Sequence, residues 1–126
     1  MNLLMCPVCR EALTLNERTW RCANSHSYDV AKQGYVNLHV VQHKHSKNPG
    51  DTRESVQARR AFLSAGHYAP LQQAVINKVR ELRIENLLDI GCGEGYYTDA
   101  MQSEVLQCVG VDIAKNAVQV AAKINK

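Results

Sequence analysis

The stretch LLDIGCGEGYYT, from Leu87 to Thr98, decides the fold of this chain. A short apolar run leads into three glycines at alternate positions, Gly91, Gly93 and Gly95, and then into residues compatible with a helix. Glycines spaced in this way let the backbone pass close under a ligand and adopt dihedral angles that other residues avoid. The stretch therefore predicts a strand, a ligand-binding turn and a helix, in that order.

The spacing of the glycines selects among nucleotide ligands. In the dinucleotide fingerprint GxGxxG the third glycine comes three places after the second, but Tyr96 occupies that place here. With Asp89 just ahead of the first glycine, the pattern is DxGxGxG, typical of the first motif of Rossmann-like S-adenosylmethionine-dependent methyltransferases. We expect Asp89 to favour the positively charged part of that cofactor. The alternative is a purely structural turn.

A second carboxylate supports the cofactor interpretation. Asp112 stands seventeen residues after Gly95, at the end of a strand predicted within residues 105–112. A carboxylate offers two acceptor oxygens, which suit the paired hydroxyls of a ribose. We therefore expect Asp112 to bind the cofactor ribose; the alternative is an ordinary surface aspartate.

Outside this motif the sequence predicts helices. Asp51 to Glu54 resembles a capping box that opens a helix from Thr52 to about Ser64. Pro70 suits the first turn of the next helix, and further helices are expected over 95–103 and 114–124. The order strand, helix, strand, helix after residue 85 predicts an α/β fold with parallel strands, the first βαβα part of an incomplete Rossmann-like domain. An apolar stripe is expected on the second helix, formed by Leu71, Ala74, Val75, Val79 and Leu82.

The N-terminal part carries a metal-binding pattern. Cys6 and Cys9 form C-x2-C, and twelve residues after Cys9 come Cys22 and His26 as C-x3-H. Two such half-sites supply four ligands for tetrahedral zinc, and four protein ligands indicate a structural rather than a catalytic ion. The alternatives are a Cys6–Cys9 redox pair or a chance grouping. We expect a small zinc-ribbon-like module whose metal compensates for a missing core.

Composition limits the classes of protein. The chain has 126 residues, a net charge of +3 and five cysteines, with no apolar run long enough to span a bilayer and no secretory signal pattern. We expect a cytoplasmic protein with reduced thiols and no membrane partner. Residues 1–66 carry nine Lys or Arg against five Asp or Glu, so the basic excess lies in the N-terminal part.

For several remaining side chains we expect no catalytic or metal-binding role. Cys92 and Cys108 have no visible base partner, so we expect small buried residues rather than nucleophiles. His39, His43 and His45 lack a ligand pattern, and we expect loop residues near phosphate rather than a second metal site.

Six segments together carry a family resemblance: CPVC, CANSH, YDVAKQGYVNL, QHKHSKNPGD, ARRAFLSAGHYAPL and LDIGCGEGYYT. In this order they resemble the bacterial 23S ribosomal RNA guanine-N1 methyltransferases of the RlmA type. The resemblance covers essentially the whole chain but only the N-terminal half of the family.

The resemblance implies roles for particular residues. It places the zinc ligands at Cys6, Cys9, Cys22 and His26, and it places Tyr68, Gly93 and Glu94 at the S-adenosylmethionine pocket. The implied reaction is methyl transfer from that cofactor to N1 of a guanine in a hairpin of 23S rRNA. The family is also associated with homodimers. No catalytic base is identified, since the later strands that usually supply one are absent.

Three functions remain open at this stage. The first is the rRNA methyltransferase, with residues 1–40 as a zinc-binding RNA-recognition module, 41–51 as a basic linker and 52–126 as a helical lead-in and truncated Rossmann-like domain. The second is a non-catalytic zinc-dependent RNA-binding fragment, and the third is a small-molecule methyltransferase. We expect a set of basic side chains to contact RNA phosphates: Arg10, Arg18, Arg21, Lys32, Lys44 and Lys47. Arg59 and Arg60 are expected to pair with nearby carboxylates instead.

Overall fold

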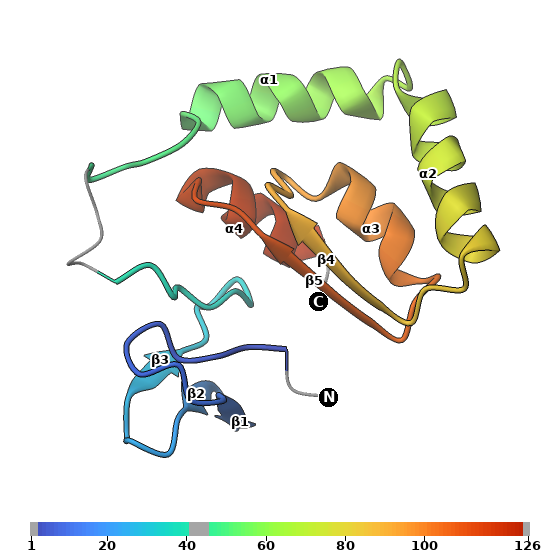
Figure 1. The fold of residues 1–126 in the computed structure, drawn as a ribbon. Helices are drawn as coiled ribbons and strands as arrows, with labels where there is room; N and C mark the ends of the chain where they lie inside the picture. The colour runs from blue at the N-terminus through green and yellow to red at the C-terminus, as the bar shows by residue number, and fades with distance from the viewer. Residues whose placement is uncertain (1–2, 41–45, 125–126) are drawn as a thin grey trace. The chain divides into compact units, whose positions relative to one another are not determined.

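A computed structural model describes residues 3–40 and 46–124. The chain divides into two compact units, Met1–Pro49 and Gly50–Lys126, and each is described by itself (Figure 1). The expectations for His43, Lys44 and His45 lie outside the described residues. Within the described ranges, no helix combines the length and the apolar character needed to cross a membrane.

The first unit contains a small antiparallel sheet. Its strands are β1 (Thr14–Asn16), β2 (Thr19–Arg21) and β3 (Ser27–Asp29), in the order β1-β2-β3. On the central strand, Trp20 pairs with Leu15 on one side and Tyr28 on the other.

Residues 35–38 form no strand of this sheet. Val36 forms only an isolated antiparallel bridge with Val30. A turn intervenes, in which Gly34 (φ 106°) donates from its backbone N–H to the Ala31 carbonyl at 2.9 Å. The Ala31 N–H donates to the Tyr35 carbonyl at 2.7 Å, so this turn closes a short hairpin between the two bridged residues.

The apolar core of the first unit is very small. Among its described residues, only Cys6, Leu13 and Cys22 are buried. Partly buried side chains surround them: Leu4, Cys9, Trp20, Tyr28 and Leu38. Since so few apolar groups cannot offset the entropy of ordering some forty residues, the unit needs an additional stabilising element.

The second unit begins with α1 (Arg53–Ser64). Its N-cap is Thr52, whose hydroxyl oxygen accepts the Ser55 N–H at 3.2 Å. The expected capping by Asp51 is therefore wrong by one residue. Both side chains are good N-caps, and the Asp51 carbonyl instead accepts from Asn116 Nδ2 at 3.4 Å.

The helix α2 (Ala69–Glu81) has a proline in its first turn, as expected. Its predicted apolar stripe is only partly covered. Val79 is buried, whereas Leu71 and Leu82 are exposed.

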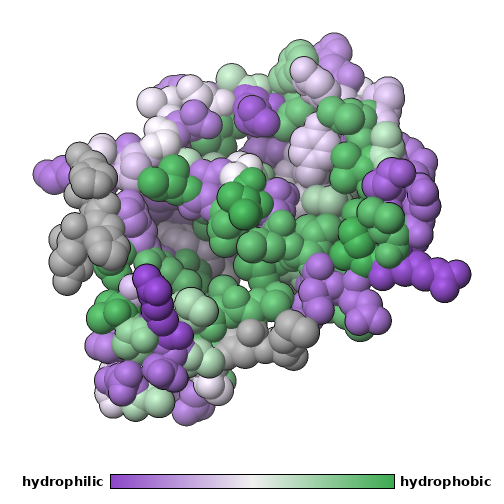
Figure 2. Space-filling view, in the orientation of Figure 1, coloured by the Kyte–Doolittle hydropathy of each residue, from purple (hydrophilic) through white to green (hydrophobic). Residues whose placement is uncertain are grey.

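The two remaining strands pair in parallel, as predicted. They are β4 (Asn86–Ile90) and β5 (Gln107–Val111), with Leu88 opposite Val109. The helices α3 (Tyr96–Gln102) and α4 (Lys115–Ile124) follow them, and α3 packs on β5. On β4, Leu88 and Ile90 remain 58% and 78% exposed. Figure 2 shows hydrophobic side chains gathered over the region where Figure 1 draws these strands.

The packing of α1 on α4 forms a buried apolar cluster in the second unit. Val56 from α1 packs with Ala114, Ala117 and Val120 at the start of α4. Gly50 lies against the same point, because a Cβ atom there would stand 2.6 Å from the Ala114 Cβ. The segment that leads into α1 is therefore seated beside the turn between β5 and α4.

Candidate functional site

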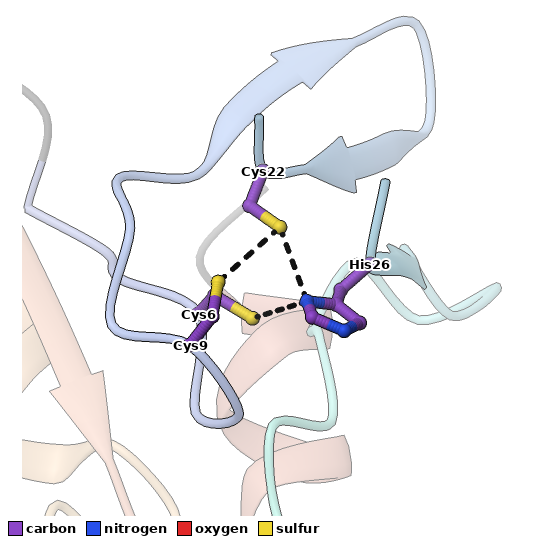
Figure 3. Close-up of side chains that lie close together, drawn as sticks. All are labelled: Cys6, Cys9, Cys22 and His26. Carbon is purple, nitrogen blue, oxygen red and sulfur yellow. Dashed lines mark hydrogen bonds between the residues drawn. The ribbon is translucent and has the colours of Figure 1, made fainter. Parts of the chain in front are cut away.

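The structure brings together the four predicted metal ligands. Their ligand atoms all lie within 4.8 Å of one another. Figure 3 shows two of the thiols next to one ring nitrogen, with His26 Nδ1 at 3.5 Å from Cys6 Sγ and 3.3 Å from Cys22 Sγ. The sulfur atoms of Cys9 and Cys22 are 3.6 Å apart.

These distances fit tetrahedral zinc. With bonds of about 2.3 Å to sulfur and about 2.0 Å to nitrogen, tetrahedral ligand atoms stand about 3.5 to 3.8 Å apart. Three thiols and one imidazole nitrogen are also the donor set that zinc prefers. Because His26 would coordinate through Nδ1, its Nε2 remains available as a donor to a neighbouring group.

Tight turns present the ligands in pairs. The Arg10 N–H donates to the Cys6 carbonyl at 2.9 Å, and the Ser25 N–H donates to the Cys22 carbonyl at 3.1 Å. Arg10 and Ser25 both adopt left-handed backbone angles, with φ of 65° and 66°. Left-handed geometry is uncommon for such residues. The contacts within the ligand cluster therefore hold these two turns in place.

Tyr28 lies directly behind the metal ligands. Its hydroxyl oxygen is 3.2 Å from Cys6 Sγ. Burial acts to raise the pKa of the Cys6 thiol, but hydrogen bonds from Tyr28 and from nearby backbone groups outweigh it and lower that pKa. The same contact, together with burial, raises the pKa of Tyr28 to about 12. The hydroxyl is therefore a neutral donor that favours the Cys6 thiolate, the form that binds zinc.

The predicted cofactor loop joins β4 to α3. All three glycines have positive φ, 75° for Gly91, 59° for Gly93 and 93° for Gly95. The N–H groups of Gly91 and Cys92 both donate to the Val111 carbonyl, at 2.8 and 3.0 Å. Side chains added at Gly91 or Gly93 would meet nothing within 4 Å. The loop is thus held from β5 and leaves open space on its outer side.

Asp112 holds the loop from the neighbouring strand. One carboxylate oxygen accepts the Gly93 N–H at 2.9 Å and the other accepts the Ala114 N–H at 2.8 Å. Each oxygen retains a further lone pair, so a ribose hydroxyl can still be accepted. The sequence had located this carboxylate but not its bonds to the loop.

Asp89 is engaged within the unit. Its Oδ2 accepts the Thr98 hydroxyl at 2.6 Å, and Thr98 is buried. This bond ties the end of β4 to the first turns of α3. The side chain is half-buried beside the loop, where its negative charge would attract a cationic ligand.

Glu94 is buried and links three segments. Its Oε1 accepts the Tyr96 N–H at 3.1 Å, at the start of α3, and its Oε2 lies 3.3 Å from Arg60 Nη1. Only 5% of the Glu94 side chain is exposed. Arg60 thus pairs with a carboxylate, but with one 34 positions away and not with a local one as expected, and Arg59 forms no ion pair among the described residues. Glu94 ties the loop to α1.

Tyr68 lies at the junction of α1 and α2, where it is the N-cap residue of α2 and 44% exposed. Gln72, one turn later, donates from Nε2 to the Tyr96 carbonyl at 2.9 Å. The start of α2 is therefore bonded to the residue that follows the glycine loop.

The thiols of the second unit are poor nucleophiles. Burial, with the nearby Asp112 and Asp89 carboxylates, raises the pKa of Cys92 to about 11. Burial also raises the pKa of Cys108. Both side chains are half-buried rather than fully buried as expected. Cys92 fills the space over Gly110, whose hypothetical Cβ would lie 3.0 Å from its sulfur.

Family models match both parts of the chain. The model described as RlmA, N-terminal, matches residues 4–47, and a methyltransferase domain model matches residues 51–126. A 23S rRNA (guanine(748)-N(1))-methyltransferase of Streptomyces fradiae is 38% identical over 98% of this chain and 45% of its own length. A protein of Micromonospora griseorubida, provisionally named a 23S rRNA (guanine-N(1)-)-methyltransferase, is 34% identical over 95% of this chain and 47% of its own length.

A zinc ribbon followed by a glycine-rich loop between parallel strands defines the class: a metal-binding module joined to part of an S-adenosylmethionine-dependent methyltransferase domain. The chain belongs to the methyltransferase-domain family that residues 51–126 match, and its N-terminal part matches the zinc ribbon of the RlmA type. It spans less than half the length of the curated relatives it matches.

Proposed function

We propose that this chain is the RNA-recognition and cofactor-binding part of a 23S rRNA guanine-N1 methyltransferase. The observation that carries the proposal is the loop held by Asp112, with three glycines at positive φ and open space outside Gly91 and Gly93. S-Adenosylmethionine supplies the methyl group when bound. The residues proposed to hold it are Tyr68, Asp89, Gly91, Gly93, Glu94, Gly95 and Asp112. Because Glu94 is buried, it would contribute by holding the loop in place from its inner side.

We propose that the zinc module, residues 1–40, binds the RNA. Residues 41–51 would form a linker, and residues 52–126 the cofactor-binding part. Arg10, Arg21, Lys32 and Lys47 are exposed and available to phosphates. Arg18 is exposed too, but it is less available to phosphates because its Nη2 donates to the Ala31 carbonyl at 2.9 Å. A cytoplasmic location and a homodimer complete the proposal, and sedimentation velocity tests the dimer.

The decisive experiment is methyl transfer. The zinc-loaded chain, alone and fused to the C-terminal part of the Streptomyces fradiae relative, is incubated with 23S rRNA hairpins and S-adenosylmethionine carrying a labelled methyl group. Nucleoside mass spectrometry should find N1-methylguanosine with the fusion, and Asp112→Ala should remove it. Labelled product at another atom, or none from a fusion that binds the cofactor, would contradict the proposal.

A second candidate function is RNA binding without catalysis. The exposed Leu88 and Ile90 favour it, because they leave one sheet face of the described chain uncovered. In that case the chain alone would bind rRNA hairpins in a zinc-dependent manner, and neither the chain nor the fusion would transfer a methyl group.

A further inference from the structure

Three aromatic rings meet at the junction of α1 and α2. The rings of Phe62 and His67 stack with centroids 4.6 Å apart and planes 19° apart. Tyr68 packs edge-on against Phe62, with centroids 5.7 Å apart. Gly66, with φ of 91°, reverses the chain after α1 and brings His67 back over Phe62. We call Phe62, His67 and Tyr68 the aromatic platform.

The platform is open to solvent. Phe62 is 48% exposed and Tyr68 44% exposed, and His67 is exposed too. Phe62 is the single phenylalanine of the chain. Phenylalanine is among the side chains most often buried, and stacked rings held in water present a flat apolar face. Such a face suits a flat ligand.

A cation stands beside the platform. Arg59 precedes Phe62 by three residues on α1, so the two share one face of the helix. The side chain of Arg59 is exposed, and no carboxylate among residues 3–40 and 46–124 lies within ion-pair distance of it. The adjacent Arg60 is paired with Glu94. A flat apolar face next to an unpaired guanidinium matches a nucleotide, with its base on the rings and its phosphate on the cation.

The two helices that carry the platform, α1 and α2, are each bonded to the cofactor loop or to the residue after it. Arg60, next to Arg59, reaches Glu94 at 3.3 Å. Gln72, four residues after Tyr68, donates to the Tyr96 carbonyl at 2.9 Å. Both bonds end within one residue of Gly95. The helix junction that carries the platform is therefore tied to the loop that is proposed to hold the methyl donor.

We infer that the aromatic platform, with Arg59, is a stacking site for a base of single-stranded RNA. The inference deepens the proposed function, on which it rests, by naming where an unpaired nucleotide of the substrate docks outside the zinc module. Stacking is tolerant of base identity because every base has a π face. The site would thus hold a splayed loop nucleotide without selecting its sequence.

The test is RNA binding by the zinc-loaded chain. A short fluorescent single-stranded RNA is titrated, and anisotropy gives the affinity. Phe62→Leu keeps an apolar side chain but removes the π face, and should weaken binding at least about fivefold. Phe62→Tyr keeps a ring and should stay within about twofold of the parent. Arg59→Gln should weaken binding and lower the slope of log affinity against log salt by about 0.7.

The matched control is Leu82→Ala, an exposed apolar residue at the other end of α2, which should leave RNA affinity unchanged. Circular dichroism melting verifies that each variant folds. Unchanged RNA affinity in a folded Phe62→Leu chain would overturn the site, as would a zinc-loaded parent chain that binds no single-stranded RNA. So would a Phe62→Leu loss confined to S-adenosylmethionine binding, since the ring would then cover the cofactor.

The two proposals can fail separately. If Phe62→Leu weakens RNA binding while the fused enzyme transfers no methyl group to guanine N1, the platform stands and the proposed function falls. If methyl transfer occurs and Phe62→Leu leaves RNA affinity unchanged, the proposed function stands and the platform falls.

Discussion

Individual side chains at the cofactor loop do more than their sequence motif indicates. Asp112 was expected as a ribose ligand, and its two oxygens also hold the Gly93 and Ala114 N–H groups. Glu94, placed at the pocket by family resemblance, is buried and paired with Arg60. The glycine pattern was readable because positive φ is a local property of the backbone. The Glu94–Arg60 pair joins residues 34 positions apart, and no local pattern specifies such a partner.

Gly50 provides a test of close packing near that loop. A Cβ atom there would stand 2.6 Å from the Ala114 Cβ and 2.8 Å from its Cα, and φ is 88°. Gly50→Ala should therefore lower the free energy of unfolding by about 1–3 kcal/mol, through overpacking and backbone strain. Urea unfolding followed by far-UV circular dichroism measures it.

Gly66→Ala is the matched control for that prediction. Gly66 has nearly the same φ, 91°, but nothing lies within 4 Å of its hypothetical Cβ. Only the strain of about 1 kcal/mol should remain. Equal losses for the two variants would show that the contact with Ala114 contributes nothing.

Cys92 provides a test of pH dependence. Burial and the two carboxylates near it raise its pKa to about 11, so the folded state favours the neutral thiol. Since the thiolate is the reactive form, alkylation of Cys92 should rise about tenfold per pH unit from about pH 7 to about pH 10. The raised pKa also means that this group's contribution to stability is present below about pH 8.5, the unfolded value, and lost as pH approaches 11.

Peptide mass spectrometry after timed iodoacetamide exposure gives the Cys92 rate apart from the other thiols. The same chain in concentrated guanidinium serves as control, where the rate should level off near the ordinary thiol pKa of about 8.5. A folded-state rate that levels off at that same pH would contradict the burial of this thiol.

The helices and strands were mostly predictable, since their signals are local. Asn86–Ile90 matches the predicted strand, and α1, α3 and α4 agree with expectation to within one or two residues at most ends. The surroundings of each element were not predictable in this way. The apolar stripe on α2 follows from its spacing, yet Leu71 and Leu82 on it are exposed. Periodicity marks an apolar face but does not supply the surface that covers it.

The zinc module should depend on its metal as a whole element. In the part of the module that the structure describes, the buried core consists of Cys6, Leu13 and Cys22, two of which are proposed ligands. A strong chelator should therefore unfold the Met1–Pro49 unit. The free energy of zinc binding should supply the folding free energy of this unit. Trp20, the single tryptophan, packs against this core and reports the change by fluorescence.

Matched cysteine variants refine the zinc experiment. Cys22→Ser should abolish stoichiometric zinc, whereas Cys92→Ser, in the other unit, should retain it. The helical circular dichroism signal, which comes from the Gly50–Lys126 unit, should persist after chelation. Loss of helix together with the Trp20 change would contradict independent units, and an unchanged Trp20 spectrum would contradict the structural role of zinc.

For the molecule as a whole, the uncovered sheet bears on cofactor affinity. The described part of the second unit has a two-stranded sheet, and Leu88 and Ile90 on β4 lie in solvent. When the cofactor binds a loop supported by only two strands, part of the binding free energy is used to order that loop. The chain alone should therefore bind S-adenosylmethionine weakly or not at all.

Fusing the C-terminal part of the Streptomyces fradiae relative should cover that surface and raise the cofactor affinity about tenfold or more. Isothermal titration calorimetry compares the chain, the fusion and a fusion to an unrelated domain of similar size. Tight one-to-one binding by the chain alone would overturn this prediction.

Local chemistry was already decided by the sequence: the ligand spacing, the glycine loop, the acidic end of β5 and the order of strands and helices. Each depends on residues within a few positions of one another or on a short repeat of backbone geometry. The tertiary structure alone decided which side chains meet across long separations. It seated Gly50 on Ala114, paired Arg60 with Glu94 and stacked the aromatic platform, because such contacts depend on how helices pack and not on the pattern within any one of them.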